Sequence, residues 1–184
     1  TSGAATAGAT PANTLTITDA DMATVSFASS TSTQGEDAGV TTLAATLTTA
    51  AGNTLENAAT FSITTMLGSA EANDFTQNVT SLTFAMGSGN GASPTTDLMV
   101  TPTPDMLVEG DETVTFTLAP TSGAATAGAT PANTLTITDA DMATVSFTSA
   151  TSTQGEDTGA TTLAATLTTA VGNTLENAAT FSVT

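Results

Sequence analysis

The sequence contains no lysine, arginine or histidine, whereas it carries 17 aspartate and glutamate residues in a chain of 184, for a formal net charge of -17. A surface of this sign repels nucleic acids and anionic lipids, so we expect no nucleic-acid partner. The sequence also lacks an uninterrupted apolar run of about 18 residues, so we expect no membrane insertion.

Cysteine is absent too, which excludes a disulfide framework and a thiolate metal site. Without cysteine, histidine, lysine or tyrosine the chain has none of the usual general bases and nucleophiles. A pair of carboxylates could serve glycoside chemistry only in a substrate cleft, and a small domain poor in aromatic residues does not provide one. We therefore expect that the protein is not an enzyme.

Short segments with strictly alternating apolar residues are the main structural signal. Hydrophobic residues make up 39% of the chain and charged residues 9%, which is too apolar for an acidic disordered tail. No segment shows an apolar period of 3.6 residues. The pattern predicts an all-β fold, an immunoglobulin-like antiparallel β-sandwich of seven strands. The expected strands are residues 23–27, 41–49, 60–67, 81–86, 98–101, 113–118 and 134–138.

The two ends of the chain are near-identical copies. Residues 1–64 recur as residues 121–184 with six conservative differences, which gives a 120-residue period. Solenoid units have periods of about 20 to 50 residues, so this period indicates tandem domains. We expect residues 1–20 to be the last strand of a preceding repeat, with a strand at 14–18. Residues 21–141 would be one complete domain, and residues 142–184 the first three strands of the next repeat.

Acidic residues are concentrated in the loop before the sixth strand. Residues 105–112 contain Asp105, Glu109, Asp111 and Glu112, and no basic side chain exists to neutralise them. Crowded carboxylate oxygens in a loop are the ligands that Ca²⁺ prefers. The loop is therefore a candidate for one half of a calcium site.

Three further acidic motifs accompany this loop in a fixed order. They are Gly35-Glu36-Asp37, Asn73-Asp74-Phe75-Thr76 and Asp139-Ala140-Asp141. Together with Asp105 and the stretch from Val108 to Thr113, they span one full period, and in this order the sequence resembles the Calx-β family of calcium-binding sandwich domains.

The resemblance implies Ca²⁺ as the bound ion and a set of ligands at one end of the sandwich. These would be Glu36, Asp74, Asp105, Glu109, Glu112, Asp139 and Asp141, with the backbone carbonyl of Leu107 as a further ligand. Proline precedes Asp105 and Ala140 separates the last two aspartates, where many family members have adjacent aspartates. We therefore expect one to three ions.

The alternative is that these loops are solvated acidic surface, and that Asp139 and Asp141 belong to a polar linker. If the ligand interpretation holds, we expect a calcium-stabilised structural repeat of a long extracellular or cell-surface protein, such as an adhesin stalk or fibre. Its partners would be neighbouring repeats of the same chain, with lateral or end-to-end self-assembly into a filament left open. The alternatives in function are a calcium-sensing regulatory domain and a ligand-binding adhesin module.

Overall fold

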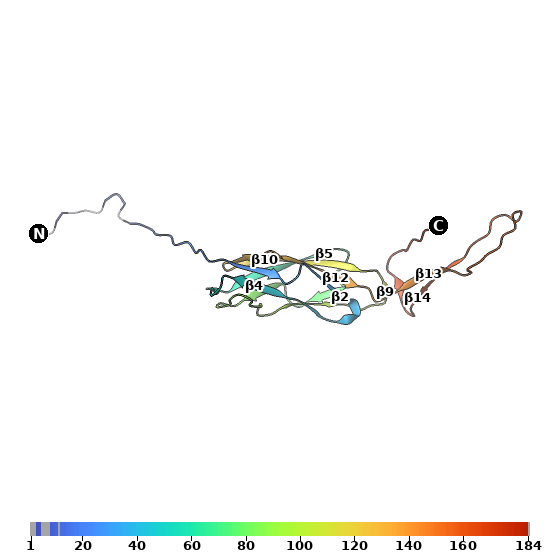
Figure 1. The fold of residues 1–184 in the computed structure, drawn as a ribbon, viewed down its shortest axis with the longest axis horizontal. Helices are drawn as coiled ribbons and strands as arrows, with labels where there is room; N and C mark the ends of the chain where they lie inside the picture. The colour runs from blue at the N-terminus through green and yellow to red at the C-terminus, as the bar shows by residue number, and fades with distance from the viewer. Residues whose placement is uncertain (1–2, 5–7, 11, 184) are drawn as a thin grey trace.

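A computed structural model describes residues 3–4, 8–10 and 12–183 of the chain. A β-sandwich occupies the middle of an elongated molecule, and the N-terminal and C-terminal segments leave it at opposite ends (Figure 1). The described residues contain no α-helix, only a short 3-10 helix, η1 (Glu36–Ala38). No helix in this part of the chain is long and apolar enough to cross a membrane.

One layer of the sandwich is a five-stranded sheet with the order β2-β12-β10-β5-β7. The pair β2 and β12 is parallel, whereas the other pairs of this sheet are antiparallel. The strands of this layer are β2 (Thr31–Gly35), β12 (Ala132–Thr138), β10 (Glu112–Ser122), β5 (Ala59–Leu67) and β7 (Ser81–Phe84).

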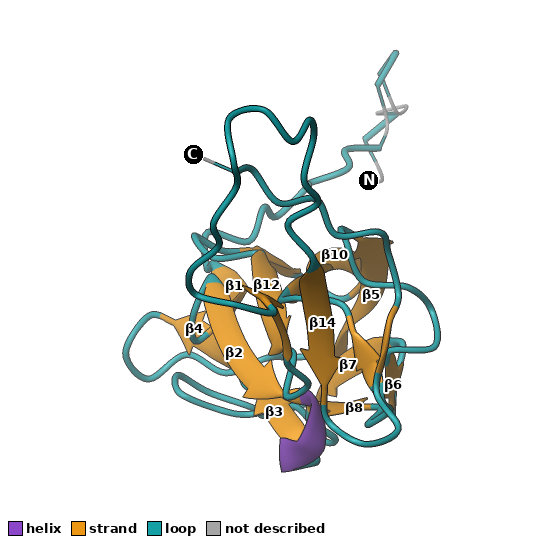
Figure 2. Ribbon diagram, turned by 90° about the vertical axis from the view of Figure 1, so that its right-hand side faces the viewer, coloured by secondary structure: helices purple, strands orange, loops and turns teal. Residues whose placement is uncertain are grey.

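The strands opposite this layer form two three-stranded sheets, with the orders β11-β1-β4 and β3-β8-β6. Figure 2 shows the strands from the end of the molecule, curled around a common interior. The first of these sheets contains β11 (Ala125–Ala127), β1 (Ala23–Phe27) and β4 (Ala45–Thr49). The second contains β3 (Thr41–Leu43), β8 (Leu98–Pro102) and β6 (Phe75–Gln77).

A single hydrophobic core lies between the layers, because alternate residues of each strand point inward. The five-stranded sheet contributes Phe61, Phe116 and Leu135, and the opposite strands contribute Val25 and Leu98, all without solvent exposure. Edge-to-face contacts join Phe61 to Phe84 and Phe75 to Phe116, with ring centroids 6.5 and 6.0 Å apart. The predicted all-β sandwich is confirmed in this form.

The strands differ in number and bounds from those predicted. The expected strand at 41–49 is two strands, β3 and β4, that belong to different sheets. The stretch between the expected strands at 23–27 and 41–49 contains β2 and η1, which were not predicted. The sequence of β2, Thr-Ser-Thr-Gln-Gly, has no apolar alternation because β2 is an edge strand whose side chains are exposed or half-buried. Likewise, the stretch between the expected strands at 113–118 and 134–138 contains the end of β10 and all of β11.

The two end segments lie outside the sandwich. The expected strand at 14–18 does not form, although its sequence is that of 134–138 in β12. Residues 134–138 pair with β10 and β2 in β12, whereas residues 14–18 belong to no strand of the described structure. At the other end β13 (Ala143–Phe147) pairs with β14 (Ala165–Thr169), while β15 (Thr174–Leu175) pairs with β9 (Leu107–Val108) of the sandwich.

Candidate metal centre

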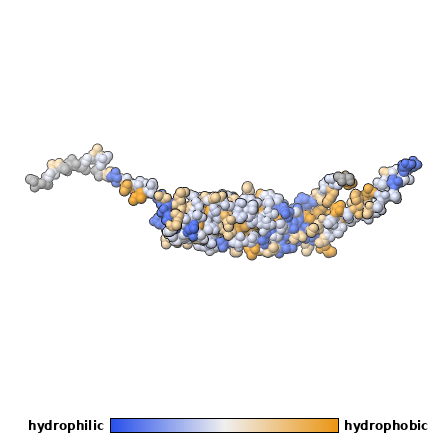
Figure 3. Space-filling model, viewed as in Figure 1, coloured by the Kyte–Doolittle hydropathy of each residue, from blue (hydrophilic) through white to orange (hydrophobic). Residues whose placement is uncertain are grey.

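The predicted acidic residues meet at the end of the sandwich that adjoins the C-terminal segment. Strand directions explain this, because β2, β8 and β12 all end there and β6 and β10 begin there. Hydrophilic residues gather at this end in Figure 3. Six predicted ligands line one small cavity, namely Glu36, Asp74, Asp105, Glu109, Glu112 and Asp139.

Glu36 is the residue that connects the cluster. Glu36 offers a carboxylate oxygen to a group with Asp139 and Asp141. The same residue also offers one to a second group, with Asp105 and Glu109. Within each group the ligand atoms lie within 4.8 Å of one another. The cavity measures about 10 Å³, which is roughly the room that one water-sized body requires. The geometry therefore brings several oxygens to one point from separate loops.

Glu36 is only 5% exposed and accepts a hydrogen bond from the backbone N–H of Ala140 at 3.3 Å. Burial raises the pKa of its carboxyl, and the negative charges of Asp139 and Asp105 raise the pKa further, against the lowering by the N–H. A buried carboxylate among other carboxylates is unfavourable unless a proton or a cation neutralises it.

The charged forms of Glu109 and Glu112 are destabilised in the same way, by burial and by neighbouring acidic groups. Burial, followed by the charges of Asp105 and Asp74, raises the pKa of Glu109 to about 7. Burial, followed by a hydrogen bond with Asp74, raises the pKa of Glu112 to about 8. Below these pKa values the two groups hold protons that a divalent cation would displace.

Asp139 organises the acidic loop before β10. Its Oδ2 accepts hydrogen bonds from the backbone N–H groups of Glu109, at 2.9 Å, and Gly110, at 2.8 Å. Its Oδ1 accepts one from the N–H of Asp141 at 2.6 Å. Gly110 has φ of 88°, a left-handed conformation that favours glycine and lets the loop turn onto Asp139. The exit of β12 and the loop before β10 are thus held together.

Asp141 carries a buried oxygen without a partner. Its Oδ1 accepts a hydrogen bond from the side-chain amide of Asn173, whereas its Oδ2 is buried and has no hydrogen-bond partner in the described structure. Such an orphaned charged atom is rare in folded proteins, because its desolvation is uncompensated. A cation beside Asp141 would compensate this charge.

Two predicted ligands need a closer description. Asp74 and Glu112 line the cavity but lie outside the two tight oxygen groups, and Asp74 accepts a hydrogen bond from the N–H of Glu71. Leu107 does not line the cavity; its N–H donates to Asp105 at 2.7 Å. The cavity is therefore lined by six of the predicted carboxylate residues, whereas Leu107, the source of the predicted carbonyl ligand, is not among its lining residues.

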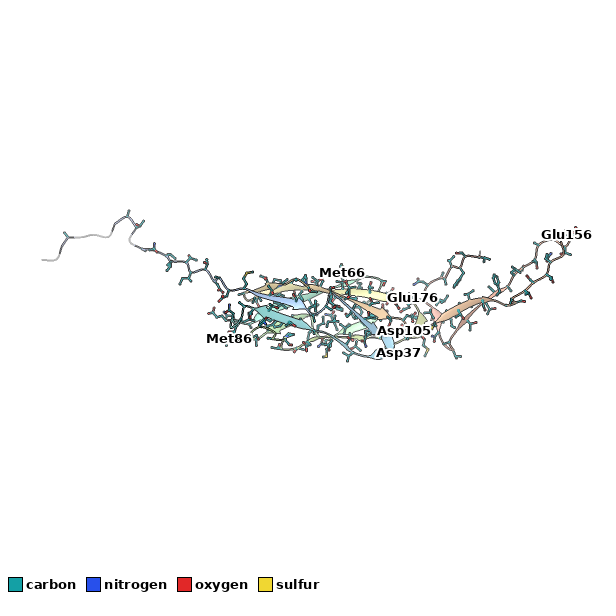
Figure 4. All side chains as sticks on the ribbon, viewed as in Figure 1. Asp37, Met66, Met86, Asp105, Glu156 and Glu176 are labelled. Carbon is teal, nitrogen blue, oxygen red and sulfur yellow. The ribbon has the colours of Figure 1, made fainter. Side chains whose placement is uncertain are left out.

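Sequence reasoning overlooked two residues of the C-terminal segment. Asn173 contacts Asp141, and the charge of Glu176 acts on both Glu109 and Glu112. Figure 4 shows Glu176 at the same end as Asp105, whereas Glu156 lies far away at the tip of the C-terminal hairpin. The signal available in the sequence was the repeat itself, since residues 173–177 duplicate residues 53–57.

The residues fit a calcium ion by their chemistry. Every side-chain atom around the cavity that could ligate a metal is an oxygen. Ca²⁺ binds six to eight oxygens in flexible geometry. No lysine, arginine or histidine exists in the sequence to form an ion pair with them instead. Those oxygens come from loops that are far apart in the sequence, so an ion there would join η1, the loop before β10 and the exit of β12.

Among solved structures, this chain is similar to domains of Calx proteins. The apo-form Calx CBD1 domain is 19% identical, with 65% of this chain and 99% of that chain covered and a TM-score of 0.54. CBD12 from CALX1.2 is also 19% identical, with 63% of this chain and 44% of that chain covered and a TM-score of 0.51. No protein-family model and no curated protein matches the chain. At this identity the likeness concerns the fold, which is a Calx-β-like sandwich.

Proposed function

We propose that the protein is a calcium-stabilised structural repeat of a long extracellular or cell-surface protein, with Ca²⁺ bound where one repeat joins the next. The observation that carries this is Glu36, a buried carboxylate shared by two oxygen groups in a chain without any basic side chain. A bound ion would neutralise the repulsion among loops that otherwise meet with like charge.

Calcium suits this cluster better than the other common divalent ions. Zn²⁺ is bound in proteins mainly through cysteine and histidine, which the sequence lacks. Mg²⁺ demands a near-ideal octahedron and retains several waters, whereas the cluster offers many carboxylates in a small space. The Calx-β-like fold and the ligand motifs of the sequence support the same ion.

A structural role follows from the position of the cluster and from the repeat. The cluster includes Asp139 and Asp141, which form the connection to the C-terminal segment. An ion there would restrict hinge motion between successive repeats and stiffen an array. Extracellular modules of this kind bind calcium weakly, with dissociation constants of roughly 10⁻⁴ to 10⁻³ M. We extend the proposal to a location outside the cell or on its surface, where calcium would be abundant enough for such weak sites, and to the absence of catalytic activity.

Glu36→Gln tests the proposal, and the chain supplies its own control. Glu156 occupies the same sequence context in the second copy but is exposed and far from the cluster. We expect millimolar calcium to raise the unfolding temperature of the parent and of Glu156→Gln, and to raise that of Glu36→Gln much less. Magnesium and chelator serve as references, and circular dichroism monitors unfolding because tryptophan and tyrosine are absent.

Identical unfolding curves in calcium and in chelator would contradict the proposal and leave the acidic loops as solvated surface. The alternative of a calcium sensor, which the Calx-like fold brings into consideration, is distinguished by the same titration. A sensor would respond at micromolar calcium with a large change in shape, which small-angle scattering measures. A stalk would respond near millimolar calcium and gain stiffness.

A further inference from the structure

The C-terminal segment is attached to the sandwich by strand addition. β15 lies parallel to β9, with Thr174 opposite Leu107 and Leu175 opposite Val108. The N–H of Thr174 donates to the carbonyl of Met106 at 3.0 Å, and the N–H of Glu176 donates to the carbonyl of Val108 at 3.3 Å. The acidic loop before β10 therefore presents a strand edge that the following segment pairs with.

This pairing also places the segment against the metal centre. Asn173, immediately before β15, donates a hydrogen bond to Asp141, and Glu176, immediately after it, acts electrostatically on Glu109 and Glu112. Apolar residues of the segment adjoin this hydrophilic end in Figure 3. One short stretch thus contacts both the acidic loop and the exit of β12.

The same stretch occurs a second time at the opposite end of the sandwich, as residues 53–57. There the N–H of Leu55 donates to Ser88 at 2.9 Å and its carbonyl accepts from Gly87 at 2.8 Å. Because strand N–H groups alternate in direction, those of Thr54 and Glu56 face the other side. Among the described residues neither has a hydrogen-bond partner. Thr54 forms an isolated antiparallel bridge with Gly89 on the side of the Leu55 hydrogen bonds, and the opposite edge, which in the other copy holds β9, carries no strand in the described structure.

A hollow lies beside this unoccupied edge. It has a volume of about 740 Å³ and is lined by residues 17–23, 53–57 and 123–124 together with Thr49. Asp19 and Asp21 in its wall correspond to Asp139 and Asp141 of the metal centre, and Asn53 corresponds to Asn173. The elements that meet at the C-terminal junction are therefore present here, apart from an acidic loop.

We propose that the edge Thr54–Glu56 is a docking site for the acidic loop of another copy of this repeat, which adds its own β9 as a parallel strand. The occupant is defined by the pairing already formed between β9 and β15, whose sequence the edge shares. Each metal centre is then closed by the repeat that follows it, with the residue equivalent to Glu176 as an additional carboxylate.

Docking in this way depends on a cation. The two surfaces carry like charges, namely Asp19, Asp21 and Glu56 on the edge, and the carboxylates of the metal centre on the loop. Without a cation these charges repel one another. With calcium bound, repeat docking and ion binding favour each other, since linkage is reciprocal. This part rests on the proposed function, whereas the strand pairing stands without it.

Proline substitutions at the two copies of one threonine test the inference in the full chain. Thr174→Pro removes the N–H that donates to Met106, and Thr54→Pro removes the equivalent N–H, which has no partner among the described residues. We expect Thr174→Pro to weaken calcium binding roughly tenfold and to abolish the exchange protection of the Glu176 amide. Thr54→Pro should leave both unchanged. Equal calcium affinity and equal protection in Thr174→Pro and the parent would overturn the coupling.

Sedimentation in calcium tests the docking site itself. In the parent, β15 competes for β9 at high effective concentration, so chains should associate weakly. Thr174→Pro frees β9 for the Thr54–Glu56 edge of another chain, and association should rise. The double variant Thr54→Pro/Thr174→Pro should stay monomeric. A monomeric Thr174→Pro, or an associating double variant, would overturn the docking site.

The two proposals fail in different ways. Absence of any calcium binding by the parent contradicts the proposed function. The exchange of the Glu176 amide in chelator reports the strand pairing without calcium. Protection of this amide in the parent and its loss in Thr174→Pro support the pairing, and fast exchange in both overturns it.

Discussion

The two copies of the repeat have nearly the same sequence but very different surroundings. Phe27 is 2% exposed in the sandwich, whereas its counterpart Phe147 is 49% exposed. Yet β13 and β14 pair in the register of β1 and β4, each shifted by 120 residues. The comparison shows that the local sequence specifies the hairpin and its register, whereas burial comes from strands far away in the chain.

The N-terminal copy teaches the same lesson in reverse. Leu135 and Ile137 of β12 are 0% and 4% exposed, while Leu15 and Ile17 are 80% and 85% exposed. The difference is the presence of β10 and β2 on either side of β12. An alternating apolar pattern therefore indicates which face of a strand would be buried, whereas the burial itself depends on the neighbouring strands.

Phenylalanine substitution should produce the largest difference between the copies. Phe61→Ala removes a fully buried ring that contacts Phe84 edge to face, so we expect a loss of about 3–5 kcal/mol in the free energy of unfolding. Phe181→Ala alters a ring that is 60% exposed, and should cost about 0.5 kcal/mol or less. Urea unfolding followed by circular dichroism measures both, and equal costs would contradict the comparison.

Aspartate substitution should give a smaller effect, measured in chelator. Asp139 accepts hydrogen bonds from Glu109, Gly110 and Asp141, whereas Asp19 accepts one from Asp21 only. Asp139→Ala should cost about 1–2 kcal/mol of stability, because the loss of these bonds exceeds the relief of repulsion with Glu36.

Asp19→Ala is the matched control and should change stability little. Asp139→Asn keeps an acceptor while removing the charge, so it should cost less than Asp139→Ala. If Asp139→Ala is as stable as the parent in chelator, the Asp139 carboxylate does not stabilise the calcium-free fold and contributes only to ion binding.

The effect of pH sharpens the comparison at the acidic loop before β10, which lies in the part of the chain that has no second copy. Glu109 and Glu112 have pKa values raised to about 7 and about 8 in the folded state, from an ordinary value of 4.5. The folded chain therefore binds more protons, and in chelator these groups contribute stability that is fully present below pH 4.5 and lost as pH rises towards 8.

The unfolding temperature in chelator should thus be higher at pH 5 than at pH 8, with a shallower slope in Glu109→Gln/Glu112→Gln. Calcium should remove this decline, because it replaces the protons at the higher pH. If the unfolding temperature in chelator rises from pH 5 to pH 8 by the same amount in the parent and the double variant, the pKa values of these two carboxyls are not raised in the folded state.

The sequence predicted the class of fold and the convergence of the acidic loops well, since alternation and motif order are local signals. Glu36, Asp105, Glu109, Asp139 and Asp141 do come together. The strand β2 was missed because an exposed edge strand has no apolar period. The contribution of Glu176 was missed because strand pairing with β9 joins residues almost 70 positions apart, which no local pattern encodes.

The parallel pairing of β2 with β12 has a mechanical consequence. The chain enters the sandwich at one end and leaves it at the other, and both strands run from the first end towards the second (Figure 1). A tensile load between the two ends pulls β2 and β12 in opposite directions along their length. The hydrogen bonds that join residues 31–35 of β2 to β12 are then loaded together in shear instead of opening one at a time. Such a geometry resists extension by sharing the force among all the bonds of the pair.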